Sequence, residues 1–144
     1  MAIYVDTSAL VKRYLPERAS QRWERFVAEE SDELLISPLT LTEVESTLQR
    51  RLRQREIDGD FAVRVRDLLA RDLEAALWVI QPFDPNVLPH ATRLIRELGV
   101  PLATLDAVHL ACAQSYGCER VATGDRQFAR AVERCQLAVH EFCE

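Results

Sequence analysis

The amino-acid sequence predicts an α/β protein with a mainly parallel sheet that helices cover on both faces. Short runs of β-type apolar residues alternate along the chain with longer segments whose apolar residues recur at helical spacing. The chain has 144 residues, of which 48% are hydrophobic, which is enough to bury one core without disulfides. Strands that alternate with helices pair in parallel, because each helix carries the chain back to the same edge of the sheet. We therefore expect residues 1–144 to form one α/β domain.

The first half of the chain is predicted to contain two strands and four helices. The first strand is a short β-type run that stops abruptly at Asp6, and Pro16 closes the helix that follows it. A break at Ile57–Asp60 separates two long helical patterns. The predicted elements are a strand at Ala2–Val5, helices at Thr7–Tyr14 and Ser20–Glu30, a strand at Leu34–Ser37, and helices at Leu41–Glu56 and Phe61–Leu77.

The second half is predicted to continue the alternation. Pro82 and Pro85 stop a short strand, and Gly99 and Gly117 each follow the last residues of a helical pattern. Glycine is common just after a helix because it adopts the left-handed backbone conformation there. The predicted elements are strands at Trp78–Ile80, Arg120–Thr123 and Leu137–His140, and helices at Val87–Leu98, Leu105–Tyr116 and Arg126–Arg134.

The charge of the chain is unevenly distributed. The net charge of −5 argues against broad, non-specific binding of nucleic acid by a basic surface. However, seven arginines and only five acids lie between Arg50 and Asp72. A solvated helical face with ion pairs is the simpler explanation of this segment, and its role stays open. Because Lys12 is the only lysine, contacts to phosphate would fall mainly to arginine.

The remaining composition indicates an intracellular protein. The four cysteines (Cys112, Cys118, Cys135 and Cys143) form neither a C-x-x-C pair nor a zinc-ligand spacing with histidine, so we expect reduced thiols. The N-terminus has no basic segment followed by an apolar one, and no 18 apolar residues run together. We therefore expect a soluble, cytoplasmic protein that does not enter the membrane.

Four acidic residues stand where strands end or helices begin. Asp6 follows the first strand directly, and Asp125 lies just beyond the strand that ends at Thr123. Glu43 and Asp106 lie at the starts of two predicted helices. In open α/β sheets, ligands bind beyond the carboxyl ends of the strands. We therefore expect these four carboxylates to gather at one edge of the sheet.

Each acid also has a purely structural explanation. Asp6 and Asp125 precede helices and can serve as N-caps. Thr40–Glu43 fits a capping box, in which the glutamate reaches back to the first amide of the helix. Asp106 can complement a helix dipole. Taken one at a time these explanations are adequate, but four independent caps have no reason to lie together.

A cluster of four carboxylates has a definite chemistry. Adjacent carboxylates repel one another unless a cation compensates them. Oxygen ligands without nearby cysteine or histidine ligands favour Mg²⁺ or Mn²⁺. Such ions can activate water and stabilise the leaving oxygen when a phosphodiester is cleaved. A substrate phosphate can complete the coordination sphere, so an acidic site is compatible with a polyanionic substrate.

Four segments of the chain carry a family resemblance. They are Tyr4–Lys12 (YVDTSALVK), Thr42–Val44 (TEV), Leu105–Ala111 (LDAVHLA) and Ala122–Phe128 (ATGDRQF). Together, in this order and at these spacings, they resemble the four motifs of the PIN-domain family. More closely, the chain resembles the VapC-type ribonuclease toxins of bacterial type II toxin–antitoxin systems, over essentially its whole length.

The resemblance implies a fold, a site and partners. The fold would be a five-stranded parallel sheet flanked by helices, and Thr7 and Thr123 would orient the acids or their waters. The acidic quartet of Asp6, Glu43, Asp106 and Asp125 would be catalytic and would hold Mg²⁺ or Mn²⁺. The implied activity is endoribonuclease cleavage of RNA, often transfer or ribosomal RNA, by a homodimer that a VapB-type antitoxin silences. Some relatives carry a further acid where this chain has Gln127, so one ion or two remain open.

Two further residues, His109 and Ser8, and one alternative function also need to be considered. His109 lies three residues after Asp106 and is either a donor or proton shuttle beside the acids or a histidine bonded within the packing. Ser8 belongs to no Ser/His/Asp pattern, and it stands where an enzyme with an aspartyl nucleophile usually has a second acid. A catalytically silent PIN-like module for RNA binding or partner capture is the main alternative, although an intact quartet argues against it.

Overall fold

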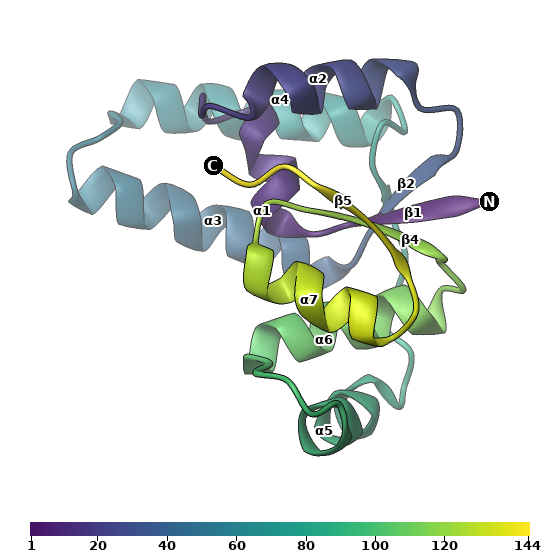
Figure 1. Ribbon diagram of the computed structural model, residues 1–144. Helices are drawn as coiled ribbons and strands as arrows, with labels where there is room; N and C mark the ends of the chain where they lie inside the picture. Colours follow the sequence, from purple (N-terminus) through teal and green to yellow (C-terminus); the bar gives the residue numbers. More distant parts are fainter.

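Five short parallel strands form one sheet in the order β3-β2-β1-β4-β5 in the computed structural model, which describes residues 1–144 (Figure 1). The prediction of an α/β fold with a parallel sheet is therefore confirmed. The strands are β1 (Ala2–Val5), β2 (Glu33–Ile36), β3 (Val79–Ile80), β4 (Arg120–Thr123) and β5 (Ala138–Glu141).

Helices follow every strand except the last. None of them is both long and apolar enough to cross a membrane. The helices are α1 (Thr7–Leu10), the 3₁₀ helix η1 (Val11–Arg13), α2 (Ser20–Glu29), α3 (Pro38–Arg53), α4 (Gly59–Glu74), α5 (Val87–Glu97), α6 (Thr104–Ser115) and α7 (Arg126–Arg134).

Two predicted helices differ from the structure, one in its type and length and the other in its first residue. The helix expected over Thr7–Tyr14 is a short α-helix that tightens into the 3₁₀ helix η1. Helix α3 begins at Pro38, three residues before the predicted Leu41, and Ser37, expected to end a strand, occupies its N-cap position. Proline suits the first turn of a helix, because the amide that it lacks would have no partner there. The apolar spacing alone could not place this start.

The sheet divides the core into two layers. Successive side chains of β1 point to opposite faces. Ile3 and Val5 pack against residues from α1 to α4, among them the buried Trp23. Tyr4 points the other way and packs against residues of α5, α6 and α7, among them the buried Phe128. Helices therefore cover both faces, as predicted.

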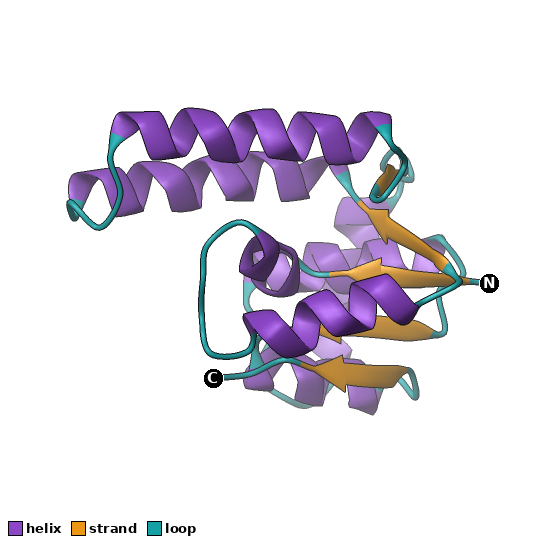
Figure 2. Cartoon of the chain, turned by 90° about the horizontal axis from the view of Figure 1, so that it is seen from above, coloured by secondary structure: helices purple, strands orange, loops and turns teal.

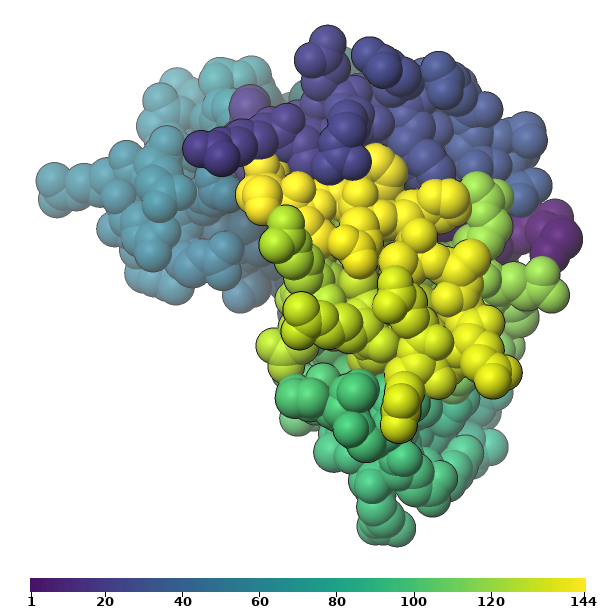
Figure 3. Space-filling model, in the orientation of Figure 1, coloured from purple at the N-terminus to yellow at the C-terminus, as the bar shows by residue number.

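Helices α3 and α4 form a long antiparallel pair that projects beyond the sheet (Figures 1 and 2). In the space-filling view the pair forms a separate lobe beside the main body (Figure 3). The turn between them covers residues 54–58 and overlaps the predicted break at Ile57–Asp60 only in part. The Asp58 side chain caps α4 by accepting a hydrogen bond of 2.8 Å from the Phe61 amide. Arg66 of α4 pairs with Glu45 of α3 at 2.6 Å and ties the two helices together.

The strand order determines where a site can form. β1 lies at the centre of the sheet, between β2 and β4. The chain proceeds from β1 to β2 and β3 on one side, and then places β4 and β5 on the other side. The order of the strands thus reverses between β1 and β4, and ligands of such folds bind at the carboxyl ends of the strands at this point. Asp6 and Asp125 follow these two strands.

Candidate active site

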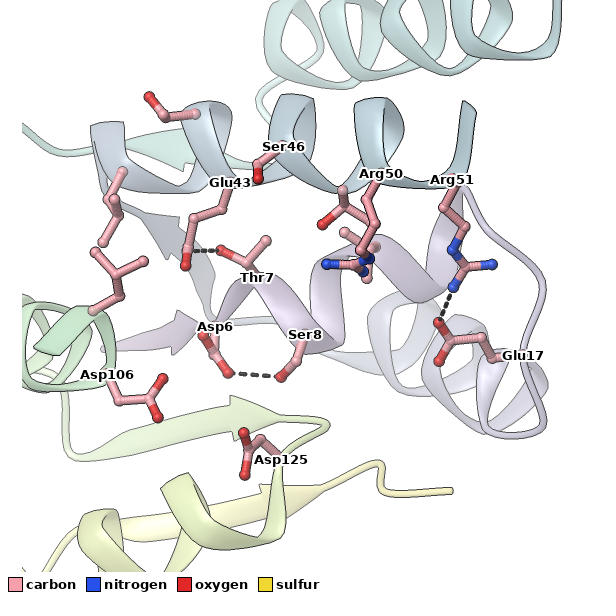
Figure 4. A pocket seen from close by; sticks show the side chains of 15 residues that line it. Asp6, Thr7, Ser8, Glu17, Glu43, Ser46, Arg50, Arg51, Asp106 and Asp125 are labelled. Atoms are coloured by element: carbon pink, nitrogen blue, oxygen red, sulfur yellow. Dashed lines mark hydrogen bonds and ion pairs between the residues drawn. The ribbon is translucent and has the colours of Figure 1, made fainter. Parts of the chain in front are cut away.

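A pocket of about 620 Å³ opens at the carboxyl ends of β1 and β4. All four acids singled out from the sequence line it, from four different parts of the chain (Figure 4). The lining residues are Asp6, Thr7, Ser8, Val11, Glu17, Leu39, Thr42, Glu43, Ser46, Thr47, Arg50, Arg51, Leu105, Asp106 and Asp125. The expected convergence of the quartet is therefore present in the fold.

Asp6 is held by its neighbours and does not cap a helix. Its residue is only 4% exposed, and its amide donates to the Ala122 carbonyl of the adjacent strand at 2.9 Å. Its Oδ2 accepts hydrogen bonds from Ser8 Oγ at 2.6 Å and from Thr123 Oγ1 at 2.8 Å. The side chain makes no capping bond to α1, so the N-cap explanation is wrong for this residue. One carboxylate oxygen is thus fixed by hydroxyls, and the other is left without a hydrogen bond.

The loop after β4 fits closely against the start of α1. The Gly124 amide donates to Ser8 Oγ at 2.8 Å, and the Asp125 amide donates to Thr123 Oγ1 at 3.0 Å. A Cβ atom on Gly124 would lie 2.7 Å from Lys12 Cε and 2.9 Å from the Ser8 carbonyl oxygen. No larger residue fits there without moving the loop. Ser8 and Gly124 therefore support the site, a role that the sequence interpretation missed because it weighed Ser8 only as a nucleophile.

Glu43 reaches the pocket from α3 and is held by two donors. Its Oε1 accepts a hydrogen bond of 2.6 Å from Thr7 Oγ1 and a very short one from His109 Nε2. The capping-box explanation is wrong, because Thr40 lies inside α3 and the Glu43 side chain does not return to its amide. Burial raises the pKa of Glu43, but the bonds from His109 and Thr7 outweigh burial and hold the pKa below its ordinary value. Glu43 is therefore charged at neutral pH.

His109 connects Glu43 to the interior of the protein. Its side chain is buried, and its Nδ1 lies 2.6 Å from the hydroxyl of Tyr4, which donates in turn to Ser37 Oγ. Burial lowers the pKa of His109, but the Glu43 bond and the charges of Asp6, Glu43 and Asp106 outweigh it and raise the pKa overall. Both sequence interpretations of His109 thus describe part of its geometry: it is bonded within the packing and also touches the quartet.

Asp106 lies in the first turn of α6 and is the least compensated acid. Burial raises its pKa to about 6, and the charges of Asp6, Asp125 and Glu43 act in the same direction, against a smaller opposing effect of His109. Its position also suits the helix dipole, as the structural explanation expected. A carboxyl group whose pKa is raised by its acidic neighbours marks a place where a cation would be stabilised.

Asp125 does cap a helix, but with one oxygen only. Its Oδ1 accepts hydrogen bonds from the amides of Gln127 at 2.8 Å and Phe128 at 3.1 Å at the start of α7. Its Oδ2 has no such partner. The structural and the functional explanations are therefore compatible for this residue.

The donor set suits a hard divalent cation. The four acids offer only oxygen ligands, and several of these oxygens have no protein partner. However, no three of the side chains already converge as a preformed metal cage. This arrangement fits Mg²⁺, which usually keeps several waters and takes only one or two carboxylates together with substrate phosphates.

The chain belongs to the PIN-domain family, whose model matches residues 3–133. PIN-domain nucleases generally use divalent metal ions. None of the curated proteins matches the chain. The family agrees with the motif resemblance seen in the sequence.

Solved structures with the same fold include toxins of toxin–antitoxin pairs. VapC20 of Mycobacterium tuberculosis, a sarcin–ricin-loop-cleaving toxin, is 20% identical with a TM-score of 0.70, covering 90% of this chain and 94% of that one. DNA-bound VapBC of Salmonella typhimurium is 20% identical with a TM-score of 0.66, covering 99% and 100%. A toxin–antitoxin complex from Klebsiella pneumoniae is 20% identical with a TM-score of 0.61, covering 88% and 90%. At this identity the similarity establishes the shared fold.

Proposed function

We propose that this chain is a divalent-metal-dependent endoribonuclease that acts as the toxin of a toxin–antitoxin pair. The observation that carries the proposal is the meeting of Asp6, Glu43, Asp106 and Asp125 in one open pocket at the carboxyl edge of the sheet. The reaction is hydrolysis, in which water attacks an RNA phosphodiester and a P–O bond breaks. Membership of the PIN-domain family supports this class of reaction.

The four carboxylates would hold one or two Mg²⁺ or Mn²⁺ ions. Such ions, when bound, activate water and stabilise the leaving oxygen of a phosphodiester. The protein's own contribution is to position the ligands. Thr7 and His109 hold Glu43, and Ser8 and Thr123 hold Asp6. Ligands that are already oriented lose little freedom when the substrate binds.

The structural neighbours support the proposal of a toxin with an antitoxin partner. One neighbour is described as a toxin that cleaves the sarcin–ricin loop, and others are complexes of toxin and antitoxin. By analogy, the RNA substrate is transfer or ribosomal RNA, the active form is a homodimer, and a VapB-type antitoxin covers the groove. Binding of operator DNA would then be the task of the antitoxin.

The first test is a cleavage assay with purified chain freed of any antitoxin. Total RNA is incubated with the protein in Mn²⁺, in Mg²⁺ and in EDTA, beside Asp6→Asn and a control variant, Asp67→Asn, which changes an exposed aspartate of α4. We expect discrete fragments that require the metal, disappear in Asp6→Asn and persist in Asp67→Asn. RNA that stays intact with every metal, but is bound by a folded protein, would overturn the nuclease and support the silent binding module.

A further inference from the structure

The pocket that holds the four acids also has a basic end. Arg50 and Arg51 line it together with the carboxylates (Figure 4). Glu43, Ser46, Thr47 and Arg50 all belong to α3 and follow one another at spacings that place them on one face of the helix. The wall formed by α3 therefore runs from a carboxylate, past two hydroxyls, to a guanidinium.

Arg50 differs from the other cations near the pocket because it has no ion-pair partner. Arg51 contacts Glu17 at 3.2 Å and Glu56 at 3.4 Å. Lys12 is buried and bound to Glu17 at 2.6 Å and to Glu144 at 2.9 Å. Arg50 is exposed and makes neither a salt bridge nor a side-chain hydrogen bond within the protein. Arg50 lines the pocket, and none of the five N–H donors of its guanidinium is bound by an acid of the protein.

The position of Arg50 along α3 indicates which group it would meet. Arg50 lies seven positions after Glu43, which corresponds to about 10 Å along the helix axis. At this separation the Arg50 guanidinium can reach a phosphate other than the one at the carboxylates. A neighbouring phosphate of the same nucleic-acid strand lies at a compatible distance, and the hydroxyls of Ser46 and Thr47 lie between the two positions.

Arg50 can also be explained by helix stability alone, and Arg53 provides a control for that explanation. Arg50, Arg51 and Arg53 all lie in the last turn of α3, where a cation stabilises the helix dipole. Arg53 shares this position and is exposed, but it does not line the pocket. A role in the dipole would therefore be common to Arg50 and Arg53, whereas a role in the pocket belongs to Arg50.

We propose that Arg50 binds a backbone phosphate of the RNA that flanks the phosphate held at the four carboxylates. This inference rests on the proposed nuclease function and deepens it. It makes the substrate a strand that extends past the cleaved bond, as an endonuclease requires. Arginine suits this role because its planar fork binds two phosphate oxygens at once. Arg50 would be a substrate-binding residue, and it leaves the chemical step to the acids.

The test compares Arg50→Gln with Arg53→Gln on a short RNA that the wild-type chain cleaves. We expect Arg50→Gln to raise KM about tenfold, which is the loss of one charge-assisted hydrogen-bonded contact, and to leave kcat within about twofold. Binding of the same RNA is measured in parallel with Asp6→Asn as the background, because we expect this variant to bind the RNA without cutting it. The Kd should rise by the same factor for Arg50→Gln, and Arg53→Gln should change neither constant.

A second measurement locates the phosphate. Single phosphates of the RNA are replaced in turn by neutral methylphosphonates, and binding to the Asp6→Asn background is measured with and without the Arg50→Gln change. We expect one position at which the neutral linkage weakens binding about tenfold when Arg50 is present and not at all when it is absent. This non-additivity identifies the two groups as a contacting pair.

The outcomes separate this inference from the function on which it rests. Cleavage by the wild-type chain together with equal KM values for Arg50→Gln and Arg53→Gln, or no coupled phosphate position, would refute the role of Arg50 and leave the nuclease intact. An absence of cleavage with every metal would refute the nuclease. In that case the binding measurements, made with the tightest-bound of several short homopolymeric RNAs, would still decide whether Arg50 contacts a phosphate.

Discussion

The two ends of the pocket are built in opposite ways. At the acidic end, hydroxyl and imidazole donors hold the carboxylates of Asp6 and Glu43 in fixed positions. At the basic end, the guanidinium of Arg50 has no protein partner and projects from an exposed helix. The acidic end is therefore ordered before any ligand arrives, whereas the basic end can adjust to one.

The difference corresponds to the two tasks that the pocket is proposed to perform. Metal-assisted hydrolysis depends on ligand positions, and small displacements of catalytic groups are costly. Contact with a backbone phosphate depends on charge and tolerates movement, because the contact carries no sequence information. We therefore expect changes at the acidic end to affect the chemical step and changes at the basic end to affect binding.

Among the changes that test this difference between the two ends, the largest effect is expected from Glu43→Gln. This change removes a charge from the quartet while keeping the size of the side chain, so it should lower the cleavage rate about a hundredfold at saturating RNA. The measurement is a single-turnover rate in Mn²⁺. Glu45→Gln is the matched control on the same helix, since Glu45 pairs with Arg66 of α4 and does not line the pocket. Equal rates for the two variants would remove Glu43 from the active site.

A smaller loss, about tenfold, is expected when the support of Glu43 is removed. His109→Leu removes the donor that bonds Glu43, and Tyr4→Phe removes only the hydroxyl that contacts His109. Groups that orient metal ligands typically contribute about 10- to 100-fold to metal affinity or activity. The measurement is the Mn²⁺ concentration that gives half-maximal cleavage, which should rise for both variants.

The control for these variants is His90→Leu, because His90 bonds to Gln114 away from the quartet. If His109 and Tyr4 served packing alone, their replacement would lower Tm without changing the Mn²⁺ requirement. That result would separate His109 from the function of the site.

At the basic end, Arg50→Gln is expected to cause a moderate decrease in the salt dependence of RNA binding. Each phosphate contact to a single strand contributes about 0.7 to the slope of log binding constant against log salt concentration. Arg50→Gln should therefore reduce this slope by about 0.7, measured by titrating the short RNA at several salt concentrations. Arg53→Gln should leave it unchanged. An unaltered slope for Arg50→Gln would mean that its guanidinium displaces no counterion from the RNA.

The smallest effect concerns the stability of the metal-free protein. The pKa of Asp106 is about 6 in the folded protein, above its ordinary value of 3.8, so its charge at neutral pH opposes folding. This penalty is absent below about pH 4 and fully present above about pH 6. Asp106→Asn should therefore raise Tm in EDTA by a few degrees at pH 7.5, and the gain should vanish toward pH 4.

The matched control is Asp60→Asn, which changes an exposed acid in the first turn of α4, outside the pocket. This variant should lose a little stability at neutral pH, because an acid there favours the helix dipole. A gain from Asp106→Asn that is the same at every pH would show that repulsion among the acids is not its cause.

Much of the site could be predicted because strand ends and helix starts leave clear signals. Asp6 stands directly after a β-type run and Asp125 just beyond another, and parallel strands bring their carboxyl ends to one edge. The strand order, however, does not follow from the sequence pattern alone. The placement of β1 between β2 and β4 makes these two acids neighbours, and it required the structure.

The supporting roles of Ser8, Gly124 and Tyr4 could not be predicted, because they depend on contacts between distant segments. The roles of Thr7 and Thr123 are expected only from the family resemblance. Ser8 and Gly124 lie 116 residues apart and meet only through the pairing of β1 with β4. Tyr4 and His109 are 105 residues apart, and tyrosine and histidine are also found in protein cores without any functional role. Helix periodicity also misplaced the start of α3, because Pro38 and Leu39 precede the first regular apolar spacing. Such contacts are tertiary, and local propensity does not encode them.

The use of one helix for both ends of the pocket has a consequence for sequence variation. Glu43 and Arg50 belong to α3, so their mutual angle depends on the number of residues between them. Inserting or deleting one residue in this interval would rotate Arg50 about 100° around the helix axis relative to Glu43. Substitutions between the two positions should therefore be tolerated far better than changes in length. A substitution of Arg50 removes the guanidinium, but a substitution between Glu43 and Arg50 leaves the angle between the two side chains unchanged, because the helix fixes it.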